Sequence, residues 1–491
     1  MMFKILLIHA NSTLDTLIPP NLAVMSACLK NAGIGVKLFD TTFYKTREIT
    51  GDDARVNTLQ VKETPFEDIG IYLNKTDMYE DFIKMVEEYQ PNLVGLSAVS
   101  LTYPFGIKFL ERLKEKFEIP TVVGGIHATI SSEDVLENPY VDYVCVGEGE
   151  QALVELCEAI RDGKDTTNIK NIWTKKNDKI IKNPLRPLSN MDELPFHDWE
   201  IFDKRRVYKP MGGKIRRVGC FELNRGCPFN CSYCCNQFLH NMYGLNYRER
   251  SVKKFIAEVK YMKNRYNLEY IYISAESFLS TKRERFLEFI KEWKAHINLP
   301  FWCETRPEAV TEEKARLLEG ARCASVSVGL ESGDLDIRKM LNRLMTDEQI
   351  INAFKYLKKT KMRISTNVII GFPDETREQI FRTIELCRRI SVDNLMVHVF
   401  NPYKGTSLYD YCIKKKYISP DIIGGDYRID TFLKMPQIST DEIRGLQRTF
   451  ALYVRLPKDR WSEISIAEKF DEEGNRKFEE LKEEYTKRWL K

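Results

Sequence analysis

The sequence predicts an α/β protein with a doubly wound N-terminal domain, a second series of strand–helix repeats and a mostly helical C-terminal region. Short apolar runs of strand length alternate with stretches whose apolar residues recur at helical spacing. The early runs are mostly β-branched or aliphatic, which is typical of parallel strands buried on both faces. With 491 residues, the chain is long enough for two or three domains that each bury a core.

The composition excludes several classes of protein. The chain is 43% hydrophobic and 30% charged, and 75 basic residues against 71 acidic ones give a net charge of +4. No global basic field therefore favours nucleic-acid binding. No apolar run approaches the roughly 18 residues that span a bilayer, and the first residues lack the features of a signal peptide. We expect a cytoplasmic protein with reduced thiols, which disfavours disulfides.

Residues 1–163 form the predicted doubly wound domain. Helical spacing occurs in residues 21–33 and 103–117. Polar or glycine-rich loops follow the strands, at the edge of the sheet where ligands bind in such folds. No G-x-G-x-x-G follows the first strand, so the dinucleotide fingerprint is absent. The predicted strands are 3–9, 35–40, 92–98, 119–125 and 141–147.

Residues 164–214 change character, and we interpret them as a linker. A small hairpin, outside the doubly wound sheet, is followed by a proline-punctuated stretch. The strand–helix rhythm resumes over residues 215–410, and residues 411–491 form the C-terminal region, expected to close the substrate site. The predicted strands of the second series are 217–223, 270–275, 300–305, 324–330, 364–371 and 394–400. Its predicted helices are 252–266, 282–296, 311–320, 347–360 and 376–390.

The segment "LNRGCPFNCSYCCNQF" carries the strongest chemical signal. Cys227, Cys231 and Cys234 form C-x3-C-x2-C after a predicted strand. Three thiolates can hold an iron–sulfur cluster and leave one iron open. A structural zinc site would need a fourth ligand, for which His240 is the candidate, since Cys235 directly follows Cys234 and is badly aimed. We interpret the remaining cysteines as structural. Those named in this interpretation are Cys220, Cys235, Cys303, Cys323, Cys387 and Cys412.

With this motif after the first strand of six β/α repeats, the second half resembles the partial (β/α)6 barrel of radical S-adenosylmethionine (SAM) enzymes, with Tyr233 just before the third cysteine. The N-terminal layout is similar to the Rossmann-like cobalamin-binding domain that precedes many of these barrels. Together they resemble the cobalamin-dependent (class B) radical SAM methyltransferases. The resemblance implies three cofactors: a [4Fe-4S] cluster held by the cysteine triad, SAM and cobalamin.

The resemblance also implies contacts at the strand ends. The implied SAM contacts are Tyr233, Glu276, Arg306, Glu331, Ser332, Gly371 and Pro373. The implied cobalamin contacts are Asn11, Ser97, Thr102, Gly124, Gly125, His127, Gly147 and Glu148. The region around Asp40 reads "FDTTFYK" and lacks the D-x-H-x-x-G histidine that ligates cobalt in cobalamin mutases. His127 could ligate cobalt instead, but a loop histidine bonding the backbone or the corrin edge is the favoured interpretation.

Three functions are compatible with this sequence. The resemblance favours a methyltransferase that uses methylcobalamin and a 5′-deoxyadenosyl radical to methylate an unactivated carbon of a small molecule or protein side chain. An electron donor such as flavodoxin or ferredoxin is implied as a partner. The alternatives are a radical SAM enzyme catalysing cyclisation or rearrangement, and a non-catalytic cobalamin or redox sensor. Methylthiolation is disfavoured, because Cys28, Cys145 and Cys157 are too far apart to resemble an auxiliary cluster motif. No catalytic acid or base is identified.

Overall fold

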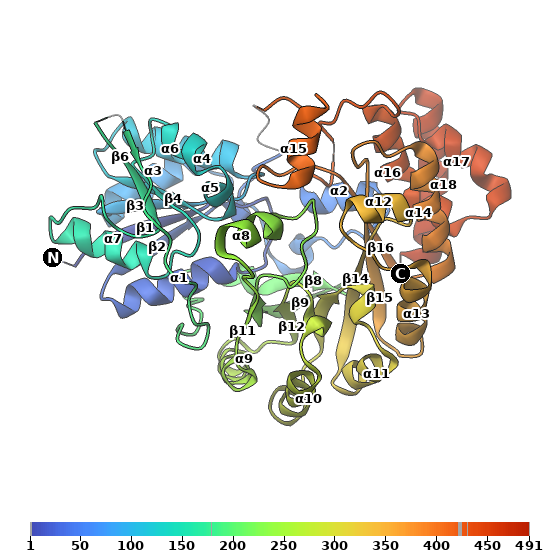
Figure 1. The fold of residues 1–491 in the computed structure, drawn as a ribbon, viewed down its shortest axis with the longest axis horizontal. Coiled ribbons are helices and arrows are strands. Elements are labelled where there is room, and N and C mark those ends of the chain that lie inside the picture. Colours follow the sequence, from blue (N-terminus) through green and yellow to red (C-terminus); the bar gives the residue numbers. More distant parts are fainter. Residues whose placement is uncertain (1, 178, 421–424, 430, 491) are drawn as a thin grey trace. The chain divides into compact units, whose positions relative to one another are not determined.

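The computed structural model describes residues 2–177, 179–420, 425–429 and 431–490. The chain divides into two compact units (Figure 1). The first comprises Met1–Thr50 and Phe66–Tyr208, and the second comprises Gly51–Pro65 and Lys209–Lys491. The predicted C-terminal region 411–491 includes residues 421–424, 430 and 491, which lie outside the described residues.

The first unit is built on a sheet with the strand order β2-β1-β3-β4-β5-β6-β7. Strands β1 to β5 pair in parallel with one another. The four middle residues of β1 are buried, as expected for a strand covered on both faces. All five predicted strands are confirmed. Their bounds are β1 (Lys4–His9), β2 (Gly35–Asp40), β3 (Leu93–Ser97), β4 (Thr121–Gly124) and β5 (Tyr143–Cys145).

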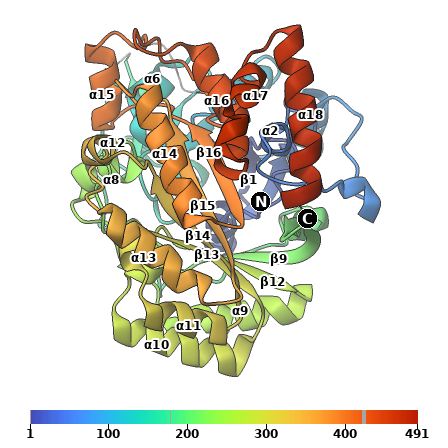
Figure 2. The ribbon, with the colours of Figure 1, turned by 90° about the vertical axis from the view of Figure 1, so that its right-hand side faces the viewer.

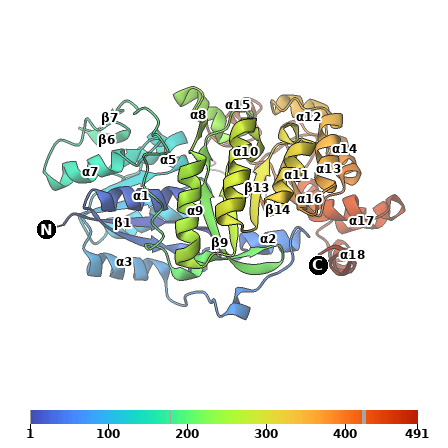
Figure 3. The ribbon, with the colours of Figure 1, turned by 90° about the horizontal axis from the view of Figure 1, so that it is seen from below.

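Helices cover both faces of this sheet, which confirms the doubly wound prediction. Figure 3 shows α1 and α3 on opposite sides of β1, and α1 packs against α7 while α3 packs against α4. The helices are α1 (Pro20–Asn31), α3 (Met78–Tyr89), α4 (Tyr103–Lys114), α5 (Ile126–Ile130), α6 (Ser132–Glu137) and α7 (Ala152–Arg161). Short 3-10 turns are η1 (Thr41–Phe43), η2 (Phe66–Ile69) and η3 (Lys204–Val207).

Two segments lie elsewhere than the sequence predicts. The hairpin of β6 (Ile172–Lys176) and β7 (Lys179–Ile181) forms, but β6 pairs antiparallel with β5 and so extends the doubly wound sheet. The expectation that it stands outside that sheet was wrong. Residues 51–65, which include α2 (Gly51–Asn57), lie within the predicted cobalamin domain but belong to the second unit.

The second unit contains a curved sheet with the strand order β16-β15-β14-β13-β12-β9-β8. The strands from β9 to β16 pair in parallel, and β8 adds an unpredicted edge strand, so the six-strand partial barrel is confirmed. The strands are β8 (Tyr208–Met211), β9 (Lys214–Glu222), β12 (Tyr270–Ser274), β13 (Phe301–Thr305), β14 (Cys323–Glu331), β15 (Arg363–Ile370) and β16 (Asn394–Val399). A separate small ladder joins β10 (Asn224–Arg225) and β11 (Arg248–Glu249).

Helices surround one side of these strands (Figure 2). Their starts follow the sequence: Thr346 with Gln349 and Thr376 with Gln379 form capping boxes at α13 and α14. The helices are α8 (Cys235–Tyr243), α9 (Val252–Tyr266), α10 (Arg283–Glu292), α11 (Glu312–Gly320), α12 (Leu335–Met340), α13 (Asp347–Lys358) and α14 (Arg377–Ile390). Short turns are η4 (Phe278–Ser280), the π-turn η5 (Trp293–Ile297) and η6 (Pro307–Ala309).

The C-terminal region is mostly helical, as predicted. The amphipathic helix α16 packs on β16 and α14, and Arg388 Nη1 satisfies three carbonyls at its end, at 2.6, 3.1 and 2.7 Å. The helices are α15 (Ser407–Lys414), α16 (Thr440–Arg455), α17 (Trp461–Ala467) and α18 (Glu472–Trp489), with the turn η7 (Lys458–Arg460). No helix among the described residues is both long and apolar enough to cross a membrane.

Candidate active site

The cysteine triad occupies the loop between β10 and α8. Gly226, directly before it, has φ +71°, and a Cβ there would lie 2.5 Å from Asn246 Oδ1, so the loop requires glycine. Cys231 is 7% exposed, while Cys227 and Cys234 are half-buried. Cys234 is the N-cap residue of α8, a position whose positive potential favours a thiolate.

Hydrogen bonds hold this loop against the rest of the barrel. Ser232 N donates to Leu341 O at 3.2 Å, and Ser232 Oγ donates to Met340 O at 2.7 Å. His240 Nε2 lies 2.8 Å from Cys227 O. This backbone contact occupies the ring nitrogen, so the structure gives no support to His240 as a fourth zinc ligand.

The cysteine geometry fits a cluster better than a single metal ion. Within the described residues, no three His, Cys, Asp or Glu side chains are placed to hold one ion together. In an iron–sulfur cluster each thiolate binds its own iron, so the sulfur atoms need not converge. The residues present therefore fit a [4Fe-4S] cluster, with three cysteine ligands and one iron open.

The fourth cysteine of the segment acts on its neighbour. A hydrogen bond from the Cys235 thiol is the largest influence on Cys234 and holds the pKa of Cys234 below its usual value. The same bond, together with burial, raises the pKa of Cys235. The Cys235 thiol thus donates to the sulfur of Cys234, a predicted cluster ligand. Cys220 is 2% exposed, and burial raises its pKa to about 12, as expected of a structural thiol.

Two buried guanidinium groups converge on Cys231. Arg306 Nη1 lies 3.1 Å from Cys231 Sγ, and the Arg306 side chain lies 3.8 Å from the centroid of the Phe229 ring and bonds Glu308 at 2.7 Å. Arg343 Nη1 lies 4.0 Å from the same sulfur. Sequence reasoning missed Arg343, because this residue follows α12 and belongs to no recognisable motif. Both cations stabilise negative charge at this corner of the site.

Three carboxylates occupy the adjacent strand ends. Glu276 accepts from Asn236 Nδ2 at 3.4 Å, and burial raises the pKa of Glu276. Glu331, at φ +64° after a bulge in β14, lies 3.9 Å from Arg343. Burial, and then the charges of Glu276 and Glu331, raise the pKa of Glu304 to about 8. Sequence reasoning missed Glu304, although its inward position in β13 was readable from strand alternation.

The other predicted SAM residues have diverse surroundings. The ring of Tyr233 lies 6.1 Å from that of Phe372, edge to face, which brings the cysteine loop to the end of β15. Gly371, at φ +78°, donates its N–H to Glu375 Oε2 at 2.6 Å, and Pro373 follows in the same turn. Ser332 is fully buried, and its hydroxyl accepts from Asp334 N at 3.1 Å. The Ser332 side chain is therefore engaged in a turn.

In the first unit, the predicted cobalamin residues gather at the carboxyl edge of β1, β3, β4 and β5. Gly125 has φ +97°, and a Cβ there would lie 2.7 Å from Ala98 O, so the loops after β3 and β4 approach as only glycine permits. Gly147, at φ +82°, donates its N–H to Thr129 Oγ1 at 3.0 Å. Gly124 ends β4. These glycine-containing loops, here called the cradle, lie at the strand ends, where ligands of doubly wound sheets bind.

Several polar side chains at this edge are engaged in the loops themselves. Asn11 Nδ2 donates to Asp15 O at 2.7 Å and to Thr42 Oγ1 at 2.8 Å. Glu148 Oε2 accepts from Ser189 N at 2.7 Å. Ser97 Oγ accepts from Asn21 at 3.4 Å, and Thr102 precedes α4. Val99, missed by the sequence analysis, exposes 47% of its surface in the loop after β3.

His127 lies in the core and not on the surface of the loop. It is 4% exposed, its Nδ1 lies 3.1 Å from Ser100 Oγ, and its ring lies 4.4 Å from that of Tyr103. His127 therefore lies in α5 with its ring on a serine side chain, whereas the sequence analysis favoured a loop histidine that bonds the backbone or the corrin edge. Its contact with cobalamin stays a prediction.

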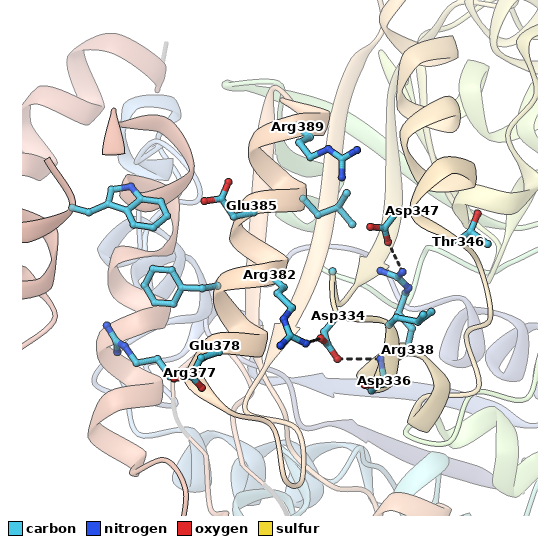
Figure 4. A pocket seen from close by; sticks show the side chains of 15 residues that line it. Asp334, Asp336, Arg338, Thr346, Asp347, Arg377, Glu378, Arg382, Glu385 and Arg389 are labelled. Atoms are coloured by element: carbon cyan, nitrogen blue, oxygen red, sulfur yellow. Dashed lines mark hydrogen bonds and ion pairs between the residues drawn. The ribbon is translucent and has the colours of Figure 1, made fainter. Parts of the chain in front are cut away.

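An open pocket of about 770 Å³ lies among α12, α14 and Trp461 (Figure 4). Its charges are largely paired with one another or with neighbours: Arg382 bonds Asp334 at 2.6 Å, and Arg338 bonds Asp347 at 2.5 Å. None of the predicted site residues lines it. We assign it no role in the chemistry.

Two family descriptions match separate parts of the chain. The B12 binding domain matches residues 8–157, and the Radical SAM superfamily matches residues 221–387. The chain thus carries a radical SAM domain together with a B12 binding domain. Its cofactors are therefore a [4Fe-4S] cluster, SAM and cobalamin.

Individual relatives agree with this assignment. The chain is 27% identical over 373 residues to an uncharacterized methyltransferase of Pyrococcus horikoshii, covering 75% of this chain and 80% of the relative. It is 28% identical over 345 residues to an anaerobic magnesium-protoporphyrin IX monomethyl ester cyclase of Rubrivivax gelatinosus, covering 68% of this chain but only 60% of the relative. The fold is similar to that of the radical SAM methyltransferase TsrM of Kitasatospora setae, solved with cobalamin and a [4Fe-4S] cluster, with a TM-score of 0.69, 15% identity and 99% coverage of each chain.

Proposed function

We propose that this enzyme is a methyltransferase that transfers a methyl group to an unactivated carbon of its substrate. The observation that carries the proposal is the presence, in one chain, of a B12 binding domain and a radical SAM domain with a complete cysteine triad. A relative with 80% of its length covered is named a methyltransferase, which supports the same activity. When bound, the cluster with SAM supplies a carbon radical, and cobalamin supplies a carrier for the methyl group.

Residues of the second unit would hold the cluster and SAM. Cys227, Cys231 and Cys234 would ligate the cluster, with Arg306 and Arg343 placing positive charge beside Cys231. Glu276 and Glu331 are suited to the ammonium group of SAM. Burial of these groups keeps water from the reacting centre, which protects a radical from side reactions.

The strand-end loops of the first unit would hold cobalamin. We propose that the Gly124–Gly125 turn and Gly147 supply the close backbone approach, and that exposed Val99 packs on the corrin. Asn11, Ser97, Thr102 and Glu148 would shape the loops or offer hydrogen bonds at their rims. His127 would position Ser100 and Tyr103 from within the core.

A second candidate function is a cyclisation of the same radical type. The similarity of this chain to an anaerobic cyclase supports cyclisation as the alternative function. A methyltransferase must consume two SAM molecules per turnover, one for the methyl group and one for the radical, and so produce S-adenosylhomocysteine and 5′-deoxyadenosine in near-equal amounts. A cyclase would produce 5′-deoxyadenosine without matching S-adenosylhomocysteine, and a sensor would produce neither.

The test is therefore a product ratio. Anaerobically reconstituted protein is supplied with SAM, hydroxocobalamin, a reductant and fractionated extract of the source cells, and both nucleosides are quantified. Cobalamin-dependent S-adenosylhomocysteine in step with 5′-deoxyadenosine supports methyl transfer. Turnover that yields 5′-deoxyadenosine alone, with no cobalamin requirement, would replace the proposal with the cyclase.

We further propose that a flavodoxin- or ferredoxin-type protein donates the electrons, and that the enzyme works in the reducing cytoplasm. The basis is chemical: an open-iron cluster needs a low-potential donor, and thiolate ligands persist where thiols are kept reduced.

A further inference from the structure

The last barrel strand, β16, lies at the edge of its sheet, and other parts of the second unit cover that edge. Gln60 Nε2 and Gln447 Nε2 both donate to Val397 O, at 2.9 and 3.2 Å, and Val399 N donates to Tyr427 O at 2.8 Å. These bonds engage two backbone groups of the edge, Val397 O and Val399 N.

His398 is a polar residue of this strand. Leu395, Val397 and Val399 are buried and alternate with it, and α16 packs on this strand, so His398 lies on the other face, that of the barrel interior. In the register it is beside Ile369 of β15. The loop that follows β16 reaches α8, since Ser407 N donates to Gln237 Oε1 at 2.7 Å. His398 is thus at the end of the barrel that carries the cysteine triad.

Two arginines lie close enough to His398 for their charges to act on it. The His398 ring lies 5.1 Å from the ring of Tyr427. Arg428, which follows Tyr427 in the chain, exposes only 7% of its side chain and donates to the carboxylate of Asp426 at 2.7 and 2.9 Å. Arg55 comes from α2, whose first residue lies so close to Arg428 that a Cβ on Gly51 would be 1.9 Å from its Nη1.

Two polar atoms, one of Arg55 and one of His398, are left without hydrogen bonds from the described residues. Arg55 Nε and His398 Nδ1 are both buried and form none there. Burial, and then the positive charges of Arg55 and Arg428, lower the pKa of His398 to about 4, so its ring is neutral near pH 7 and can donate or accept one hydrogen bond. Buried polar groups without partners are unfavourable, and a ligand that bonds them removes that penalty.

We propose that Arg55, Arg428 and His398 form a recognition site for an oxyanion group of the substrate, a carboxylate or a phosphate or phosphonate. Guanidinium groups and an imidazole N–H are complementary to such a group, because its oxygens accept several hydrogen bonds at once. Asp426 pairs with Arg428 and orients it, and Asp52 pairs with Arg55 at 3.0 Å. The inference rests on the proposed function only in taking the bound molecule to be the substrate.

The test uses the reconstituted full-length protein and inorganic phosphate or acetate as the probe. The chain has six histidines, so ¹⁵N-histidine spectra can be assigned by single variants. Phosphate, acetate or both should shift the His398 signal saturably while leaving that of exposed His296 unchanged, and comparing the two probes identifies which oxyanion is preferred. Arg55→Gln and Arg428→Gln should each weaken this binding at least about 10-fold, which is about 1.4 kcal/mol, whereas Arg265→Gln, on the exposed face of α9, should not.

Gly51→Ala provides a variant that keeps every charge. Its new methyl group would displace Arg428, so the phosphate or acetate shift should weaken in this protein too, with thermal unfolding confirming that it is folded. No saturable shift with either probe, or equal shifts at His398 and His296, would overturn the proposal. So would loss of the shift on adding SAM, because the site would then hold the SAM carboxylate. None of these results depends on methyl transfer, so failure here is distinguishable from failure of the proposed function.

Discussion

Replacing Gly125 by alanine tests the proposed cobalamin cradle in the first unit. Gly125 has φ +97° and ψ −177°, a region that is essentially confined to glycine. Imposing it on alanine costs about 1–3 kcal/mol. The added Cβ would also lie 2.7 Å from Ala98 O and 3.2 Å from Ala98 N, both backbone atoms that cannot rotate away. Overpacking of this kind adds about 1–3 kcal/mol.

We therefore expect Gly125→Ala to lower the free energy of unfolding by about 2–6 kcal/mol. Because relief of the clash separates the loops after β3 and β4, cobalamin affinity should fall at least about 10-fold, or about 1.4 kcal/mol. Denaturant unfolding measures the first effect, and absorbance titration with hydroxocobalamin measures the second.

Gly163→Ala is the matched control. Gly163 also has positive φ, at +62°, but no atom lies within 4 Å of an added Cβ. It should lose only about 1–2 kcal/mol and bind cobalamin as the original protein does. Equal cobalamin affinity in Gly125→Ala and the unmodified protein would refute the reasoning, because the cradle would then not contact the cofactor.

Three further predictions concern the second unit. Alanine at Cys235 should leave about four irons per chain. Alanine at any triad position (Cys227, Cys231 or Cys234) should abolish iron binding and SAM cleavage. Equal losses of iron on replacing Cys235 and Cys234 would contradict the ligand assignment. Arg343→Gln should move the cluster midpoint, followed by EPR redox titration, to more negative potential, and Arg343→Lys should move it less. Burial raises the pKa of Glu375 to about 8 in the folded state, so the folded protein holds this proton at higher pH than the unfolded chain does. The free energy of unfolding should therefore fall by on the order of 3 kcal/mol as the pH rises from about 5 to about 8, because the proton of Glu375 stabilises the folded state. Glu375→Gln should show a smaller fall over that range.

The sequence predicted the elements that depend on local pattern. The parallel strands of both sheets were readable because each is a short apolar run between turn residues, whereas the edge strands β6, β7 and β8 were not placed in these sheets. The cysteine triad was readable from spacing alone. The helix starts at Thr346 and Thr376 carry their own capping signals.

Features that depend on tertiary contacts were missed. Residues 51–65 were included in the first domain because nothing in their composition reveals the Gln60 bond to Val397 O, more than 300 positions away. The β6–β7 hairpin was placed outside the sheet because the sequence of β6 gives no signal of its antiparallel pairing with β5. Arg343 belongs to no motif, and its place beside Cys231 follows from the packing of the α12 end on the cysteine loop.

The most direct test of methyl transfer is isotopic. Reconstituted enzyme with cobalamin and reductant is given SAM that carries a CD₃ group, together with small-molecule and protein fractions of the source cells, and products are analysed by mass spectrometry. We predict a product in which one CD₃ group, with all three deuterium atoms retained, replaces a hydrogen on carbon, and its formation requires both cobalamin and the intact cysteine triad. A product formed by this enzyme without label from SAM, and equally well without cobalamin, would contradict the account.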